Sequence, residues 1–161
     1  MSRQFFTSDQ HFGHEAILRH CAETRAYRSV DAMNEDYRLK WNAVVGPNDD
    51  VWYLGDFSMK FSFVEQFAAD LNGRKHLVVG NHDKCFKSMD KQQVDRYLAC
   101  GFASVEPFDL VDLAGLCFAL CHFPYRVPEE HLSSDPQILR SSDCRPGIPV
   151  CGKVSGVGGT G

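Results

Sequence analysis

The stretch Phe5-Phe6-Thr7-Ser8-Asp9-Gln10-His11 joins an aromatic and hydroxyl-rich run to an acid and an imidazole. Such a run predicts a first β-strand over residues 4–8 that delivers Asp9 at its carboxyl end. Asp9 and His11 are two residues apart, so on an extended backbone their side chains point to the same side. This pair is therefore a candidate to hold one metal ion.

Three further apolar runs end in the same kind of polar group. Buried strands are predicted over residues 51–54, 75–79 and 115–123. They deliver Gly55-Asp56, Gly80-Asn81-His82-Asp83 and Cys121-His122. Each group alone is common in turns or helix caps, and a lone histidine is usually satisfied within the core. Four such groups in order, each directly after a strand, are poorly explained by coincidence.

Helical patterns alternate with the first three strands. A short helix is predicted over residues 14–20 and a firmer one over 31–45, where apolar residues recur at helical spacing. A capping-box pattern opens a helix over 62–71, and a further helix is predicted over 90–100. Strand, polar loop and helix in this order predict an α/β sheet with its site at the carboxyl ends of the strands.

The later part of the chain changes character. Residues 102–113 and 115–123 are predicted to form adjacent strands without a helix between them, which indicates a second, more antiparallel sheet. Residues 124–146 hold four of the seven prolines and are predicted to form a loop. A last short strand is predicted over 148–151.

Composition limits the classes of function. The 161 residues predict a single domain over 1–161, and 43% hydrophobic with 24% charged residues is typical of a globular protein. The formal charge of -4 argues against a broad nucleic-acid surface, although a small phosphate-bearing substrate remains compatible with it. No apolar run approaches the roughly 20 residues that span a bilayer. Without a signal-peptide pattern at the N-terminus, a cytoplasmic location is expected.

The seven cysteines are scattered, and none forms a Cys-x-x-Cys pair. Reduced thiols are therefore expected rather than a disulfide framework. A zinc cluster built from Cys121, His122, Cys144 and Cys151 is an alternative that this spacing disfavours.

The donor types indicate which chemistry the strand ends would support. Aspartate, histidine and asparagine suit manganese, iron, zinc or magnesium rather than soft metals. A carboxylate such as Asp56 has two oxygens and can bridge two ions. Two divalent ions about 3.5–4 Å apart would activate a bridging water and clamp a phosphoryl group. His82 would then stabilise the transition state or protonate the leaving oxygen, and Asp83 would hold its imidazole.

These motifs resemble the calcineurin-like metallophosphoesterase family, over most of the chain from Phe5 to about Gly152. Residues 6–14, 41–49 and 71–83 are most similar to its small bacterial and phage branch. The resemblance implies a four-layer αββα fold, two sheets packed face to face with helices outside. It implies hydrolysis of a phosphomonoester or phosphodiester at two divalent ions, with manganese favoured over iron, zinc, nickel and magnesium.

The resemblance also assigns the site residues. The first ion would be held by Asp9, His11 and Asp56, and the second by Asp56, Asn81 and His122. The catalytic histidine would be His82. For His14 two roles stay open, contact with the substrate phosphate or a structural place in the first turn of its helix, and the structural role is favoured.

The chain departs from the family at its closing motif. Where the family has Gly-His-x-His, this sequence has Gly152-Lys153-Val154-Ser155, and a protonated amine or a hydroxyl is a poor replacement for imidazole. The glycine-rich residues that follow resemble a truncated end. Weakened metal affinity and activity are therefore expected, and a non-catalytic metal-binding or scaffold protein with the same fold is the alternative. Restoring both histidines is expected to raise metal content and activity.

Overall fold

The computed structural model describes residues 2–113 and 115–123 with their side chains, together with the backbone of 137–140 and 150–151. Four parallel strands form the centre of the first sheet, in the order β4-β3-β2-β1, and β8 (Val150–Cys151) lies antiparallel against β1. The parallel strands are β1 (Gln4–Thr7), β2 (Asp50–Tyr53), β3 (Arg74–Val78) and β4 (Phe102–Glu106).

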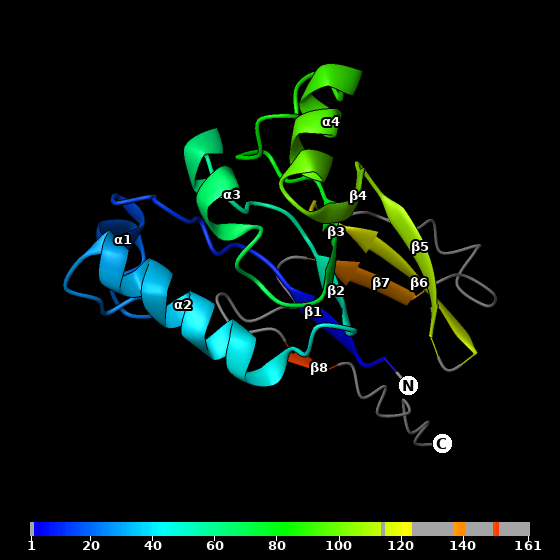
Figure 1. Cartoon of the computed structure of the whole chain (residues 1–161), viewed down its shortest axis with the longest axis horizontal. Coiled ribbons are helices and arrows are strands. Elements are labelled where there is room, and N and C mark those ends of the chain that lie inside the picture. Colours follow the sequence, from blue (N-terminus) through cyan, green and yellow to red (C-terminus); the bar gives the residue numbers. More distant parts are fainter. Residues whose placement is uncertain (1, 114, 124–136, 141–149, 152–161) are drawn as a thin grey trace, which may run out of the picture.

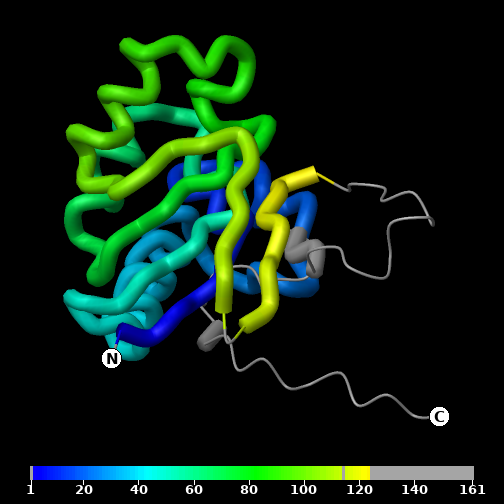
Figure 2. Tube along the Cα trace, turned by 90° about the vertical axis from the view of Figure 1, so that its right-hand side faces the viewer, coloured from blue at the N-terminus to red at the C-terminus, as the bar shows by residue number. Residues whose placement is uncertain are grey.

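A second, three-stranded sheet has the order β5-β6-β7. Its strands are β5 (Asp109–Leu113), β6 (Leu116–Cys121) and β7 (Gln137–Arg140). The β5–β6 hairpin is antiparallel, whereas β7 runs parallel to β6. Figure 2 looks onto this hairpin, which lies in front of the first sheet as a layer of its own.

Helices connect the strands of the parallel sheet. They are α1 (Ile17–His20), α2 (Val30–Val44), α3 (Phe61–Phe67) and α4 (Lys91–Ala99). The Asp90 side chain caps α4 by accepting from the Gln93 N–H, as the sequence predicts, and Ser29 caps α2 in the same way. In the part of the chain that is described, no helix has the length and apolar character needed to cross a membrane.

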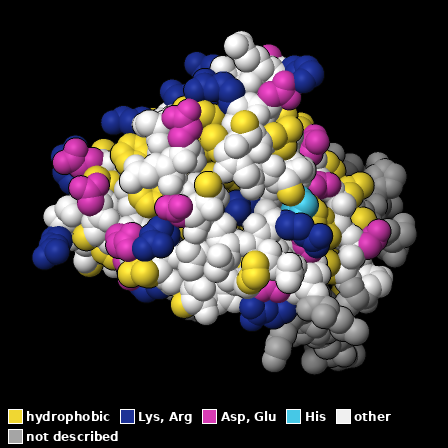
Figure 3. Space-filling model, in the orientation of Figure 1, with side chains coloured by type: hydrophobic (Ala, Val, Ile, Leu, Met, Phe, Trp, Pro, Cys, Tyr) yellow, Lys and Arg dark blue, Asp and Glu magenta, His cyan; other side chains and the backbone are white. Residues whose placement is uncertain are grey.

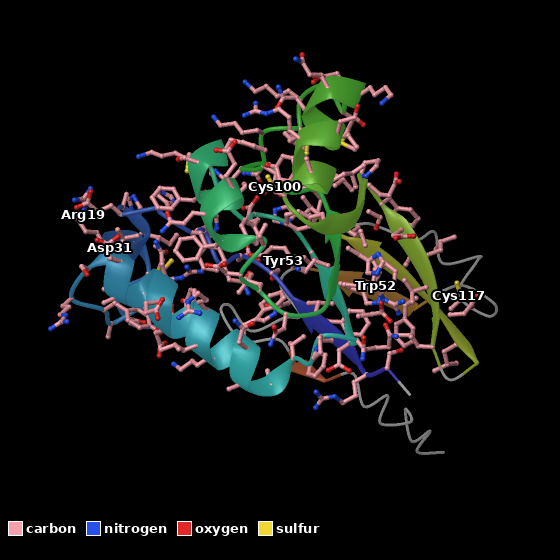
Figure 4. The ribbon with its side chains drawn as sticks, viewed as in Figure 1. Arg19, Asp31, Trp52, Tyr53, Cys100 and Cys117 are labelled. Carbon is pink, nitrogen blue, oxygen red and sulfur yellow. The ribbon has the colours of Figure 1, made fainter. Side chains whose placement is uncertain are left out.

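Alternation along the strands explains the layers. In Figure 4, Tyr53 points towards the helices, whereas its neighbour Trp52 points towards the second sheet. Likewise, Phe5 packs into the core under the helices, and Phe6 packs into a smaller core between the sheets. Figure 1 shows α2, α3 and α4 on one side of the parallel sheet and β5, β6 and β7 on the other. Both faces of this sheet are therefore covered, as is usual for parallel strands.

Several predicted boundaries are wrong. The strand predicted over 102–113 breaks into β4 and β5, which belong to different sheets. The predicted loop over 124–146 contains β7. The capping box at Ser62 does not form, because α3 begins one residue earlier, at Phe61. The residue at its N-cap is Lys60, whose side chain makes no capping hydrogen bond, and the helix ends at Phe67.

The fold class is thus mixed α/β, with a four-stranded parallel sheet and a small second sheet. Among the described residues, helices cover only one side of the two sheets, so the outer helical layer of the αββα arrangement stays a prediction. On the face seen in Figure 3, acidic and basic side chains are interspersed.

Candidate metal centre

The carboxyl ends of β1 and β2 are joined beyond the last ladder pair. The Asp9 N–H donates to the Gly55 carbonyl, and the His11 N–H donates to the Asp56 carbonyl, each at 3.0 Å. Because the two strands are parallel neighbours, both polar segments leave the sheet at the same edge. The predicted convergence of the first two motifs is confirmed.

The backbone at this edge is not extended, which corrects the predicted local geometry. Asp9, His11 and Asp56 have φ values of 57°, 53° and 62°, in the left-handed region that is rare for residues with a Cβ. Asp9 and His11 therefore meet because the chain curls at each of them, rather than because of strand alternation. Such strain persists only where surrounding contacts impose it, and it is concentrated at functional sites.

Glycine is required where the second and third strand ends approach each other. A Cβ on Gly80 would lie 2.3 Å from Asp56 Oδ1 and 2.5 Å from the Asp56 nitrogen. A Cβ on Gly55 would lie 2.6 Å from His122 Nδ1, and its φ of +89° also favours glycine. The two glycines in the motifs thus allow Asp56 and His122 to approach the backbone closely.

Asp56 lies at the centre of the cluster. Its Oδ2 is 3.6 Å from His11 Nε2, 3.6 Å from His122 Nε2 and 3.9 Å from His82 Nε2. The side chains form two groups of three, and within each group the candidate ligand atoms all lie within 4.8 Å of one another. Both groups include Asp56. One group adds His11 and His82, and the other adds Asp9 and His122.

These separations fit shared cations better than direct hydrogen bonds. Two donor atoms each about 2.1 Å from one ion at a tetrahedral angle lie roughly 3.4 Å apart. The imidazole of His122 gives an independent indication. Its Nδ1 lies 2.7 Å from the Leu54 carbonyl, which only accepts, so Nδ1 carries the proton. In the neutral ring, Nε2 then presents a lone pair, the form in which histidine binds metal.

The lone pair of His122 faces other acceptors. Asn81 Oδ1 lies 3.2 Å from Nε2, and Asp56 Oδ2 lies 3.6 Å from it. Converging acceptors repel one another unless a cation or a proton lies between them. The side chains present therefore fit a metal site in which Asp56 belongs to both groups of candidate ligands.

His14 also lies within this cluster. Its ring centroid is 5.5 Å from that of His11 and 6.2 Å from that of His82. The His14 carbonyl accepts from the Ile17 N–H at the start of α1, so the residue has a local structural place as well. Burial, followed by the neighbouring charges of His11 and His82, lowers the pKa of His14.

The predicted role of Asp83 needs correction. Its carboxylate does not hold the His82 imidazole but accepts from three backbone N–H groups, those of Asp56, Phe57 and Gly80, at 2.8–3.0 Å. Burial and then the charge of Asp56 raise the pKa of Asp83 to about 6. Asp83 is therefore a positioning residue that ties the ends of β2 and β3 together.

Asp9 titrates differently from Asp83. Burial alone would raise the pKa of Asp9, but contacts with His11 and Ser8 and the charge of His122 outweigh it and lower this pKa. Asp9 is thus held ionised, as a metal ligand must be.

Sequence reasoning missed Arg25. This guanidinium is only 3% exposed and donates to the carbonyl of Gln10 at 2.8 Å and to that of Asp9. It stabilises the backbone of the curled segment that presents Asp9 and His11. The sequence gives no signal for it, because Arg25 lies in the loop between α1 and α2 with no motif around it.

The remaining predictions concern the end of the chain. Lys153 and Ser155 lie outside the described residues, as do Cys144 and the side chain of Cys151. Within the described ranges, no cysteine belongs to either group of candidate ligands. Cys121 instead donates its thiol hydrogen to the Phe123 carbonyl.

Comparisons with known proteins leave the function open. No protein-family model matches the chain. It is 37% identical over 89 residues to the Gene 66 protein of Mycobacterium phage L5, a match that covers 52% of this chain and 41% of that protein. The chain thus spans less than half the length of this relative.

Two solved structures are similar. The protein of unknown function AQ665 from Aquifex aeolicus aligns with a TM-score of 0.62 at 28% identity, over 82% of this chain and 67% of that chain. This likeness supports the α/β fold. A novel archaeal phosphodiesterase aligns with a TM-score of 0.42 at 17% identity, over 76% of this chain and 60% of that chain. That value is too low to bear on fold or function.

Proposed function

We propose that the chain is a metal-dependent phosphoester hydrolase of the calcineurin-like metallophosphoesterase type. The observation that carries the proposal is the position of Asp56 Oδ2, which lies within 4 Å of three imidazole nitrogens and belongs to both groups of candidate ligands. A shared carboxylate between two cation positions is the arrangement expected of a two-metal hydrolase.

When bound, two divalent ions would lower the pKa of a water molecule and neutralise the charge of a phosphoryl group. Asp9, His11, Asp56, Asn81 and His122 would hold these ions, with manganese as the favoured metal. The Leu54 carbonyl orients the His122 ring by accepting from Nδ1–H.

His82 is proposed as the proton donor to the leaving oxygen. Its side chain is 34% exposed, more than His11 or His122, so it lies on the open side of the cluster. The His82 N–H donates to Asp56 Oδ1 at 2.9 Å, which fixes the backbone of this residue relative to the candidate ligand. Its grouping with His11 and Asp56 gives it a second possible role as a ligand, and a His82→Gln variant separates the two by its metal content.

A non-catalytic metal-binding or scaffold protein is the second candidate, favoured by Lys153 and Ser155 in the closing motif. Metal content separates the candidates, because about two ions per chain favour the enzyme and one or none favours the scaffold.

The test combines metal analysis with hydrolysis of p-nitrophenyl phosphate and its bis ester in added manganese. Asp56→Asn is expected to lose both ions and at least about 100-fold in rate, since Asp56 is common to both ligand groups. Asp70 carries an exposed carboxylate in the turn after α3, and Asp70→Asn is the matched control, which is expected to behave as wild type. A rate that survives Asp56→Asn or a chelator would overturn the proposal.

A further inference from the structure

Two exposed phenylalanines lie beside the candidate metal centre. The Phe123 ring packs edge-on against the imidazole of His122, with centroids 4.9 Å apart and an interplanar angle of 89°. The Phe86 ring lies 5.4 Å from that of Phe123, tilted by 44°. Although in contact, Phe86 and Phe123 remain 40% and 42% exposed. We call this pair the aromatic platform.

The backbone of the turn that carries Phe86 is held in place. The Phe86 N–H donates to the Asp83 carbonyl at 3.1 Å, and the neighbouring Lys84 N–H donates to the Tyr97 hydroxyl at 3.0 Å. Cys85, between them, is fully buried in the core under the helices. The turn that carries Phe86 is thus fixed to the same Asp83 that positions Asp56, so the backbone under the ring needs little ordering when the ring binds a ligand.

The chemistry around the platform indicates what it binds. Lys84 and Lys87 flank Phe86 on the same turn, and both are exposed. An exposed aromatic face with lysines on the same turn, next to a site for a phosphoryl group, complements a molecule with a planar ring and a phosphate. Base–aromatic stacking with cationic contacts to phosphate is the usual recognition of nucleotides and single strands.

The platform adjoins the candidate centre through His122. The Phe123 ring contacts the His122 imidazole, with 4.9 Å between ring centroids, and His122 Nε2 lies 3.6 Å from Asp56 Oδ2. A base beside the platform and a phosphate at Asp56 are therefore neighbours on the same side of the cluster as His122.

We propose that Phe86 stacks on the base of a nucleotide-type phosphoester, with Phe123 beside it on the side of His122, which identifies the substrate class of the candidate centre. The inference rests on the proposed function for the position of the phosphate, but base stacking is measurable without turnover. A purely structural pair would show no preference for a base.

The test compares adenosine 5′-monophosphate with ribose 5-phosphate, which share sugar and phosphate and differ only in the base. Binding to the manganese-loaded protein is measured by calorimetry, and phosphate release is measured in parallel. Wild type is expected to bind the nucleotide roughly 10-fold more tightly than the sugar phosphate, the effect of one stacked base.

Variants at Phe86 distinguish stacking from packing. Phe86→Leu keeps apolar bulk without a π face and is expected to bring the two affinities within about twofold, with ribose 5-phosphate unchanged. Phe86→Trp is expected to keep the preference or increase it. Leu39→Ala, an exposed apolar change on α2, is the control and is expected to leave both affinities unchanged.

Equal affinities in wild type, or a Phe86→Leu variant that keeps the preference or weakens both ligands alike, would overturn the inference. Failure of the proposed function is recognised separately. If neither these compounds nor a generic diester is hydrolysed, the hydrolase proposal fails, whereas a base preference lost in Phe86→Leu would still establish the platform.

Discussion

Gly80→Ala tests the geometry of the centre without changing any candidate ligand. The added Cβ would lie 2.3 Å from Asp56 Oδ1, where ordinary contacts begin near 3.4 Å, so the two strand ends must separate by about 1 Å. The second contact, at 2.5 Å, is with the Asp56 backbone nitrogen, and rotation of a side chain does not relieve it. Gly80 does not have a positive φ, so the effect is steric rather than conformational.

Two terms set the magnitude. Overpacking of a close contact costs about 1–3 kcal/mol. Separation of the strand ends also weakens the hydrogen bonds from the Asp56 N–H to Asp83 and from the His82 N–H to Asp56, at about 1 kcal/mol each. The sum, about 3–5 kcal/mol, predicts a fall in Tm of roughly 6–20 °C for a chain of this size.

Thermal unfolding by circular dichroism and metal analysis check this together. Gly80→Ala is expected to have a lower Tm. It is also expected to lose both ions, because a shift of about 1 Å displaces the oxygen common to both ligand groups. Gly46→Ala is the matched control, since the nearest atom to its Cβ would be Asp49 Oδ2 at 3.2 Å, about 1 Å farther than the closest contact at Gly80. If Gly80→Ala keeps wild-type Tm and metal content, the close approach of Gly80 and Asp56 is wrong.

Two further predictions concern charged groups. Arg25→Met leaves the buried carbonyls of Asp9 and Gln10 without their donor, so we expect the free energy of unfolding in urea to fall by about 2–4 kcal/mol. Manganese affinity is expected to fall as well, with Arg25→Lys intermediate. Unchanged metal affinity would contradict the positioning role. Hydrogen bonds from Arg3 hold the pKa of Asp49 well below its usual range, so this carboxylate contributes stability above about pH 4 that is lost as the pH falls towards the folded-state pKa. Wild type is therefore expected to lose urea resistance below about pH 4 more steeply than Asp49→Asn, and parallel profiles would refute this assignment.

The sequence predicts the strand ends well because their signals are local. Apolar runs such as Val51–Leu54 and the cap formed by Asp90 and Gln93 are determined by neighbouring residues, and both are present in the structure. Because parallel strands end at one edge, the sequence predicts that the segments of Asp9 and Asp56 meet, although not the curled backbone that turns their side chains together.

What the sequence could not predict depends on contacts distant along the chain. The break between β4 and β5 falls at Pro107, a local signal that the predicted single strand passed over, but no local pattern shows that the two strands join different sheets. The partners of Asp83 are backbone amides in the segments that follow β2 and β3, which no motif encodes. Arg25 likewise acts on a segment 15 residues away through carbonyls that every residue possesses.

Backbone strain provides an argument for function that is independent of the motifs. Among the described residues, four that are not glycine have a positive φ, and three of them are the candidate ligands Asp9, His11 and Asp56. Glycine at any of the three would adopt the same φ without the Cβ penalty, so stability alone does not explain an acid or an imidazole there. The side chains are therefore retained against a local cost, and the curled backbone is what directs all three towards one point. The fold positions the strand ends, and these strained residues make the strand ends a site.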